Sequence, residues 1–370
     1  MRILVDYRAA LRERSGVGEY LHTLIHAYQQ TYRDDLTVFT SSWKDRPDPR
    51  IGTALHGRVV DRRIPVTVLN YLWHRLEWPP AESLAGPADV AHSAHPLLVP
   101  ARHAAQVITI HDLDFLSHPE RTTREIRRDY PALAGAHARR ADAIITSTEY
   151  ARQLVATTFD VAADRIYVCP PGAPSWTSLG RQPQVPANGV VLFLGTLEPR
   201  KNLGVLLDAY ERLSAQGGAP PLVLAGRATP AAQPWLDRIA RAPLSSLVTH
   251  AGYVPDGERE RLFGRARMLV LPSADEGFGL TTLEAMSAGI PVIASNRGSL
   301  PEVVANGGML LDPDDPAAWA DAIARVATDD AWAAQLGAAG LARARAFTWP
   351  ATAARLRQAY TDAITRRGER

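Results

Sequence analysis

The sequence predicts an α/β protein with two doubly wound, Rossmann-like domains, and three observations carry that prediction. Short apolar runs, typical of buried parallel strands, alternate with segments of helical periodicity along the whole chain. A stretch rich in Pro, Gly and Ser at residues 170–189 divides these runs into two series. The length of 370 residues exceeds one typical hydrophobic core. We therefore expect two parallel sheets, each covered by helices on both faces.

Each apolar run is predicted to form one strand. In the first series the predicted strands are residues 2–6, 36–40, 89–93, 105–112, 142–148 and 165–169. In the second series they are residues 189–195, 221–226, 247–252, 267–273, 290–295 and 308–312. Helical periodicity is clearest at residues 203–215 and 256–266. This alternation predicts an N-terminal domain at residues 1–170, a linker at 171–188 and a C-terminal domain at 189–346.

Composition narrows the class of protein. The chain is 46% hydrophobic and 22% charged with a formal net charge of +2, which indicates a globular protein without general affinity for nucleic acid. Its single cysteine, Cys169, excludes an internal disulfide, fits a reducing compartment and is expected to be buried in a strand. No apolar run approaches the ~20 residues of a spanning helix, and the N-terminal one is too short for a signal peptide. These features predict a cytoplasmic protein.

The stretch ADEGFGLTTLEAMSAG at residues 274–289 follows a predicted strand, at the edge where parallel sheets bind ligands. Gly277 and Gly279 permit a tight turn and a close approach of the backbone. A helix that begins near Thr281 would direct free N–H groups and the positive end of its dipole at a ligand. This loop therefore predicts an anion-binding site.

Charged side chains at the same edge support that prediction. Arg200 and Lys201 follow the strand at 189–195, and beside a helix N-terminus they indicate a dianionic or diphosphate ligand, although alone they would suit a solvated surface. Glu276 follows a strand end, where a carboxylate is either solvated or bound to a polar group. Glu284 has two interpretations, because Thr281-x-x-Glu284 also fits a capping box in which Glu284 is only structural.

Two other motifs give weaker signals. The Gly-rich helix entry SGVGEYL at 15–21 lies about ten residues beyond its strand and lacks the third glycine of a dinucleotide fingerprint, which disfavours a dehydrogenase. The histidines of HSAH at 92–95 have no third ligand nearby in sequence, so they do not predict a zinc site.

On these residues the chain resembles the retaining GT-B glycosyltransferases of family four. The spacing of Glu276 and Glu284 in EGFGLTTLE matches the family's E-x7-E pattern, and GTLEPRKN at 195–202 matches its strand-end diphosphate clamp. Residues 252–280 follow the family's order of base-contacting loop, helix, strand and donor loop. One departure is Thr281, where proline is commoner, but threonine can also occupy the start of a helix.

The N-terminal half resembles the bacterial mannosyltransferase branch of that family, in TIHDLDFLSHPE at 109–120 and ADAIITSTEYAR at 141–152. FTWPATAARLRQAY at 347–360 resembles the family's last helix. The resemblance implies a GT-B fold with the two domains facing a central cleft, and a helix at 347–370 that returns to the N-terminal domain.

The resemblance also implies roles for residues of the C-terminal domain. Glu284 would accept hydrogen bonds from ribose hydroxyls, and Glu276 would hold hydroxyls of the donor sugar. Arg200 and Lys201 would stabilise charge on the leaving nucleoside diphosphate. The remaining donor-binding positions would be Gly195 in the clamp, Tyr253 and Val254 beside the base, and the backbone of Phe278, Gly279, Leu280 and Thr281 around the phosphates.

In the N-terminal domain, Gly16 and Gly18 would approach the diphosphate, and His111 would lie near the sugar. The alternative for His111 is a strand-end histidine satisfied by its neighbours. Asp112 and Asp114 spell D-x-D, a metal motif of a different glycosyltransferase fold, but the family context argues against a metal here.

The implied activity is transfer of a hexose, with mannose from GDP-mannose favoured, to a hydroxyl of a saccharide or glycolipid in polysaccharide biosynthesis. The implied step is a front-face displacement that retains anomeric configuration without a cofactor or metal. Two alternatives remain open: a nucleotide-sugar epimerase of the same architecture, and a nucleotide-binding pseudoenzyme.

The arginines of residues 121–140 suggest a further partner. Arg124, Arg127 and Arg128 would share one helix face and could meet anionic lipid, but a solvated face explains them as well. The segment has few apolar side chains to insert into a membrane. We therefore expect at most a peripheral, salt-sensitive membrane contact.

Overall fold

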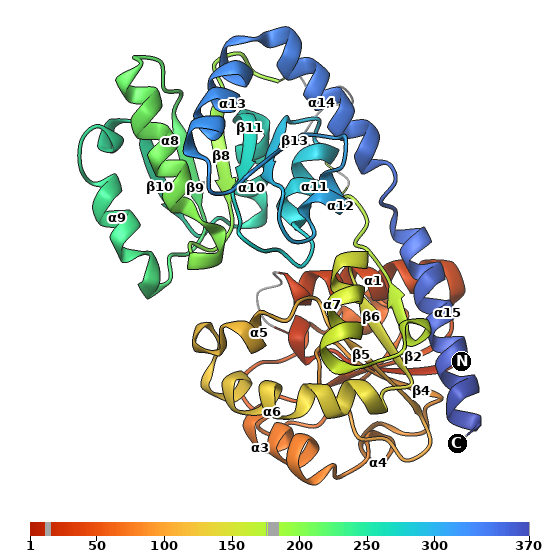
Figure 1. Cartoon of the computed structure of the whole chain (residues 1–370). Coiled ribbons are helices and arrows are strands. Elements are labelled where there is room, and N and C mark those ends of the chain that lie inside the picture. Colours follow the sequence, from red (N-terminus) through yellow and green to blue (C-terminus); the bar gives the residue numbers. More distant parts are fainter. Residues whose placement is uncertain (12–15, 175, 177–184, 370) are drawn as a thin grey trace. The chain divides into compact units, whose positions relative to one another are not determined.

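A computed structural model describes residues 1–11, 16–174, 176 and 185–369. The chain forms two compact units (Figure 1). The N-terminal unit comprises residues 1–172 and 348–370, and the C-terminal unit comprises residues 173–347. Of the predicted linker at 171–188, residues 175 and 177–184 lie outside the described residues.

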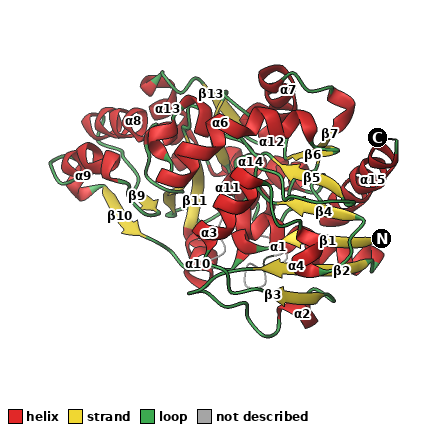
Figure 2. Ribbon diagram, turned by 90° about the horizontal axis from the view of Figure 1, so that it is seen from below, coloured by secondary structure: helices red, strands yellow, loops and turns green. Residues whose placement is uncertain are grey.

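The N-terminal unit contains a parallel sheet of seven strands in the order β3-β2-β1-β4-β5-β6-β7, which Figure 2 shows side by side. The strands are β1 Arg2–Asp6, β2 Asp35–Thr40, β3 Arg58–Asp61, β4 Val90–Ser93, β5 Ala105–Thr109, β6 Ala143–Thr146 and β7 Ile166–Val168. The sequence predicted all of these except β3. This edge strand has no fully buried residue, so it lacks the apolar run by which the others were found.

Alternating side chains along these strands enter two separate cores. In β5, Val107 packs with helices α1 (Val17–Tyr32) and α15 (Trp349–Gly368), whereas Ile108 packs with α6 (Arg124–Arg140) and α7 (Glu149–Phe159). In β1, Leu4 faces a third cluster that contains Trp73 and Leu69 of α3 (Val66–Tyr71). Because both faces are covered by helices, the strands read as nearly continuous apolar runs.

The helices of this unit are short except for α1, α6, α7 and α15. Their bounds are α1 Val17–Tyr32, α2 Ile51–Ala54, α3 Val66–Tyr71 with a π-helical turn at Leu72–Leu76, α4 Ala81–Ala85, α5 Asp114–Ser117, α6 Arg124–Arg140, α7 Glu149–Phe159 and α15 Trp349–Gly368. Thr123, Thr148 and Thr348 cap α6, α7 and α15 through their side chains.

The C-terminal helix α15 is part of the N-terminal unit, although 175 residues of the other unit precede it in the chain, from 173 to 347. Its apolar residues Leu356 and Tyr360 join the core formed by α1 and the sheet. The Tyr360 hydroxyl lies 2.7 Å from Nδ1 of buried His92 in β4. This contact satisfies a polar group that would otherwise be costly to bury.

The C-terminal unit contains a parallel sheet of six strands in the order β10-β9-β8-β11-β12-β13. The strands are β8 Val190–Leu194, β9 Leu222–Ala225, β10 Val248–Gly252, β11 Ala266–Leu271, β12 Val292–Ser295 and β13 Met309–Leu311. The helices are α8 Leu203–Ala215, α9 Gln233–Ile239, α10 Asp256–Arg265, α11 Leu280–Ser287, α12 Leu300–Val304, α13 Pro316–Thr328 and α14 Asp330–Ala344.

The order of strands in this sheet reverses direction between β8 and β11. From β8 the chain moves outward through β9 to β10, and then returns to β11 and continues through β12 to β13. Right-handed crossovers in opposite directions place their helices on opposite faces, and doubly wound sheets bind ligands outside the carboxyl ends of the strands at such a reversal. The predicted ligand-binding loops follow these two strands.

Within the described residues, no helix is long and apolar enough to span a membrane.

Candidate functional site

The loops after β8 and β11 are joined directly at the carboxyl edge of the C-terminal sheet. The amide of Ala274 donates a hydrogen bond of 2.8 Å to the carbonyl oxygen of Arg200. Gly195 follows β8, and Gly226, which follows the neighbouring β9, lies so close to it that a Cβ on Gly226 would be 1.9 Å from the Gly195 carbonyl oxygen. Backbone contacts therefore fix the positions from which Arg200, Lys201 and Glu276 project.

Those three side chains meet in one cluster. Lys201 Nζ pairs with Glu276 Oε1, and Arg200 places a guanidinium nitrogen 3.3 Å from Glu276 Oε2. Ser273 Oγ donates to Glu276 Oε1 at 2.8 Å. Glu276 is only 5% exposed, so it is neither a solvated loop carboxylate nor an isolated one.

The cluster fixes the charge of Glu276. Burial alone would raise the pKa of this carboxyl, but Lys201 and Arg200 outweigh burial and hold the pKa below its ordinary value. Arg200 also donates to Glu198 Oε1 at 2.6 Å. Glu198 and Ser273 are partners that the sequence analysis did not identify, although both lie in the motifs that it quoted.

The donor loop presents unpaired amides to the same edge. Helix α11 begins at Leu280, and its N-cap Gly279 has a φ of 85°, where a Cβ would collide with Leu300. Among the described residues, the amides of Phe278, Gly279, Leu280 and Thr281 have no hydrogen-bond partner. Four adjacent free N–H groups at the start of a helix favour an anion such as a phosphate.

The structure corrects the capping-box interpretation of Glu284. Because α11 begins at Leu280, Thr281 is the second helical residue and not the N-cap, and Glu284 lies beyond the first turn. The Glu284 carboxylate pairs instead with the guanidinium of Arg259 on α10. The sequence analysis missed Arg259, because a charged residue within a charged helix segment carries no local signal of its partner.

The other predicted donor-binding residues of this unit differ in exposure. Tyr253, after β10, is 48% exposed and lies under the guanidinium carbon of Arg227 at 4.6 Å from its ring centroid. Val254 packs partly against the core. The Phe278 side chain is buried edge-on against Phe347, so only its backbone is available to a ligand.

The predicted site residues of the N-terminal unit lie near the start of α1. Gly16 is the N-cap with a φ of 53°, and a Cβ on Gly18 would lie 2.5 Å from the Ala9 carbonyl oxygen. His111 packs edge-on against Tyr20 of α1, with ring centroids 4.9 Å apart. Ser15 of the predicted Gly-rich entry lies outside the described residues.

His111 is not a fully satisfied strand-end histidine. Its Nε2 is buried without a hydrogen-bond partner among the described residues. Burial lowers the pKa of His111 to about 4, partly offset by Asp112, so the ring is neutral at physiological pH.

Two motifs set aside at the sequence level have internal partners. Both ring nitrogens of His92 are engaged, by Tyr360 and by Thr109 Oγ1 at 2.8 Å. Asp112 accepts from the amide of Asp114, whose own carboxylate pairs with Arg121. Neither motif gathers a set of free metal ligands.

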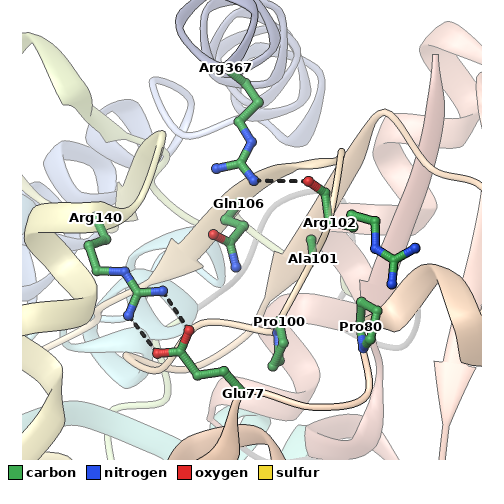
Figure 3. A pocket seen from close by; sticks show the side chains of 8 residues that line it. All are labelled: Glu77, Pro80, Pro100, Ala101, Arg102, Gln106, Arg140 and Arg367. Carbon is green, nitrogen blue, oxygen red and sulfur yellow. Dashed lines mark hydrogen bonds and ion pairs between the residues drawn. The ribbon is translucent and has the colours of Figure 1, made fainter. Parts of the chain in front are cut away.

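A cavity of about 380 Å³ lies at the opposite, amino edge of the N-terminal sheet, lined by Arg102, Arg140 and Arg367 with Glu77 and Gln106 (Figure 3). Arg140 forms a bidentate pair with Glu77, and Arg367 donates to the Arg102 carbonyl oxygen. Helices α6 and α15 end here, and arginines in a last turn compensate the negative end of a helix dipole. These contacts give the arginines structural roles away from the ligand edge.

Comparison with known proteins finds two matching family descriptions and several relatives of similar sequence. The family description "Glycosyl transferases group 1" matches residues 181–343, and "Glycosyltransferase Family 4" matches residues 14–175. The O-antigen chain mannosyltransferase B of Escherichia coli is 34% identical over 315 residues, which cover 80% of this chain and 80% of that protein. A D-inositol 3-phosphate glycosyltransferase of Corynebacterium efficiens is 32% identical over 243 residues, covering 61% of this chain and 57% of that protein.

Among solved structures, the sucrose-phosphate synthase of Thermosynechococcus elongatus has a TM-score of 0.74 and 23% identity, covering 97% of this chain and 98% of that one. Two parallel-sheet units of this kind, with helices on both faces, define the GT-B architecture. The chain belongs to family four of the GT-B glycosyltransferases and is therefore a transferase.

Proposed function

We propose that the protein is a retaining hexosyltransferase that moves mannose from GDP-mannose to a hydroxyl of a saccharide or glycolipid acceptor. The observation that carries the proposal is the buried Arg200–Lys201–Glu276 cluster beside the free amides of residues 278–281. Cations and free amides suit a diphosphate, and a buried carboxylate suits sugar hydroxyls. Mannose is supported by the relative named as an O-antigen mannosyltransferase, and GDP by the resemblance of residues 109–120 to that branch.

The proposed step exchanges one bond at the anomeric carbon for another on the same face. The bond to the leaving phosphate oxygen breaks while the acceptor oxygen bonds to the anomeric carbon, and the leaving oxygen takes the acceptor proton. The sugar passes through an oxocarbenium-like state. Arg200, Lys201 and the free amides stabilise the negative charge that grows on the diphosphate.

We further propose that no cofactor or metal takes part, because this unit supplies the positive charge through two side chains and a helix N-terminus. The test is a panel of GDP-, UDP- and TDP-sugars, each assayed with and without methyl α-mannoside, and with and without EDTA. We expect transfer from GDP-mannose at a rate that EDTA leaves unchanged. Release of an altered free sugar without any acceptor would indicate the epimerase, and no turnover of any donor would indicate a pseudoenzyme.

The two glutamates are expected to differ in which part of the donor they bind. Glu284→Gln should weaken binding of GDP itself, because the proposed ribose contact does not involve the sugar. Glu276→Gln should leave GDP binding nearly unchanged and weaken binding of GDP-mannose. Calorimetry with both ligands on both variants measures the difference.

Thermal unfolding of the same variants is the control. Glu276→Gln should also lower Tm, because it leaves Lys201 buried without its carboxylate. Glu284 is not part of a capping box, so Glu284→Gln should change Tm little. Equal losses of GDP affinity in the two variants would contradict these assignments.

We propose that any membrane contact through residues 121–140 is peripheral and weak. Most arginines of this segment have internal partners: Arg127 donates to carbonyls of Pro119, Glu120 and Thr122, and Arg128 pairs with Asp129. Arg124 remains exposed. We expect slight flotation with anionic vesicles at low salt. Raising the salt concentration to about 0.5 M, which shortens the Debye length to a few ångströms, should abolish this flotation. Binding to neutral vesicles at high salt would overturn this proposal.

A further inference from the structure

A second polar cluster lies at the carboxyl edge of the N-terminal sheet, where strand order reverses. β1 pairs with β2 on one side and with β4 on the other, so the connections that follow β1 and β4 leave in opposite directions. Ligands of doubly wound sheets bind outside this reversal point. Asp6 ends β1, and His95 follows β4 by two residues.

A chain of hydrogen bonds begins at Asp6. Arg8 donates to both carboxylate oxygens of Asp6 at 2.8 and 2.6 Å, and its other terminal nitrogen donates to Asn70 Oδ1 at 2.6 Å. The Asn70 amide then donates to Glu125 Oε1 at 2.7 Å. The Arg8 guanidinium also lies over the Trp73 ring, 4.8 Å from its centroid. Buried charge and stacking thus hold the half-buried Glu125 carboxylate in one orientation.

Two histidines close the cluster on its other side. The rings of His74 and His95 meet edge to face at 5.8 Å, and His95 lies 3.6 Å from Asp6 and stacks on Tyr130. His74 is 4% exposed, yet neither of its ring nitrogens, nor Nδ1 of His95, has a hydrogen-bond partner among the described residues. Buried unpaired nitrogens are costly, and such groups commonly await a ligand or water.

The charges of the cluster exclude two classes of ligand. Asp6, Glu125 and Asp129 balance Arg8, Arg75 and Arg128, and Asp129 is occupied by the last two at 2.8 and 2.7 Å. A metal ion at His74, Glu125 and Asp129, whose ligand atoms lie within 4.8 Å of one another, would compete with these guanidinium groups. Among the described residues, Arg8, Arg75 and Arg128 already have carboxylate partners, and a phosphate bound here would face the Glu125 carboxylate.

A hydroxyl group fits where the ions do not. It can donate to the carboxylate of Glu125 and to an unprotonated imidazole nitrogen, and it can accept from an imidazole N–H. Burial, with His95 and Arg8 nearby, lowers the pKa of His74 to about 3, so that ring offers one donor and one acceptor at neutral pH.

We propose that Glu125 and the unpaired imidazoles of His74 and His95, supported by Asp6, Arg8 and Asn70, bind hydroxyl groups of the acceptor, and that this acceptor ends in a neutral sugar and not in a phosphorylated polyol. The proposal rests on the proposed glycosyl transfer and specifies its acceptor class. A neutral acceptor agrees with the relative named as a mannosyltransferase, whereas the relative named as a D-inositol 3-phosphate glycosyltransferase implies a phosphorylated acceptor. The side chains of this cluster favour the neutral acceptor.

The test measures binding of two probe sugars to the full chain by saturation-transfer NMR, without any donor. Methyl α-mannoside is the neutral probe, and mannose 6-phosphate is its anionic counterpart. We expect binding of the neutral sugar, and a rise of its Kd by roughly tenfold or more in Glu125→Ala, as for loss of a hydrogen bond to a charged group. Asn70→Ala, which removes only the support of Glu125, should give a smaller rise.

Glu120→Gln is the matched control, since Glu120 lies in the same region with its carboxylate 64% exposed and should leave both Kd values unchanged. Hydrolysis of GDP-mannose without acceptor should stay unchanged in Glu120→Gln. In Glu125→Ala, KM for methyl α-mannoside should rise with little change in kcat. Unchanged sugar binding in Glu125→Ala, or tighter binding of mannose 6-phosphate, would overturn the inference. Failure of the transferase proposal would show separately, as absence of turnover in the unaltered chain.

Discussion

Replacing Arg200 by alanine is expected to lower kcat by roughly 10²–10³, about 3–4 kcal/mol of lost transition-state stabilisation. The guanidinium lies at the carboxyl edge of β8 with its side chain 23% exposed, within reach of a ligand. It acts in our proposal on charge that develops only as the diphosphate leaves. Its removal should therefore affect kcat more than KM for the donor.

The structure indicates that Arg200→Ala should affect catalysis without lowering the stability of the fold. Glu276 keeps its contacts with Lys201 and Ser273 when Arg200 is lost, so no buried carboxylate is left unpaired and Tm should change little. Steady-state kinetics with GDP-mannose measure the effect, and Arg241→Ala, an exposed arginine after α9, serves as the control. If only KM for the donor rises, Arg200 binds the ground state and the proposed role is wrong.

Acidification below pH 6.5 is expected to destabilise the N-terminal unit much more than the C-terminal unit. Four histidines of the N-terminal unit have a pKa lowered chiefly by burial: His74 and His92 to about 3, and His111 and His137 to about 4. The C-terminal unit contains a single histidine, His250. Each of the four is neutral in the folded unit but protonates in the unfolded chain below its ordinary pKa of about 6.5.

The sign of the effect follows from proton counts. Between pH 6.5 and about 4 the unfolded chain binds more protons, so the stability present above pH 6.5 is lost as pH falls. Each histidine contributes about 1.4 kcal/mol per pH unit within this window, hence at most roughly 5.6 kcal/mol per pH unit for all four. Urea unfolding from pH 7.5 to 4.5, with hydrogen exchange to locate the opening, measures this slope.

One variant tests the origin of that slope. His137 accepts a hydrogen bond from the Leu98 amide through Nδ1, and a glutamine oxygen could take the same role without titrating. His137→Gln should therefore reduce the slope of unfolding free energy against pH by about 1.4 kcal/mol per pH unit, which corresponds to one proton. His26→Gln, at an exposed position of α1, should leave the slope unchanged. Equal acid sensitivity of the two units would contradict the assignment to these histidines.

Two histidines of the N-terminal unit have unpaired buried ring nitrogens: His111, which follows β5 and contacts Tyr20 of α1, and His74, in the π-helical turn at Leu72–Leu76, which lies 3.8 Å from Asp129 of α6. Natural proteins leave few buried polar groups without partners, and each one needs an explanation. Our proposals give each of these two histidines a ligand-binding role in the N-terminal unit.

Much of the fold could be predicted from the sequence, because burial on both faces leaves a local signature. An apolar run such as 189–195 records that both sides of β8 are covered, and it does so without knowledge of its neighbours. The edge strand β3 escaped prediction because its residues are only partly covered. The loops with Arg200, Lys201 and Glu276 were found for a related reason, since ligand-binding loops follow strand ends.

The pairing of side chains could not be predicted in the same way. The spacing of Glu284 to Thr281 suggested a capping role, and its spacing to Glu276 suggested a ligand-binding role. Its contact with Arg259 became visible only when α10 and α11 were placed. Similarly, HSAH gave no hint that His92 bonds to Tyr360, or that His95 lies beside Asp6 and His74.

The sequence by itself thus determined all the strands except β3 and the family that the chain resembles, and it predicted which loops bind the ligand. Tertiary structure alone decided that Glu276 is buried between two cations and that Glu125 is held by Asn70 and Arg8. Periodicity reports the environment of each residue along its own segment, whereas the identity of a partner depends on strand order and helix packing. Strand order and helix packing are properties of the whole unit. They decide which charged side chains meet, and a buried charge is tolerated only where it meets a partner.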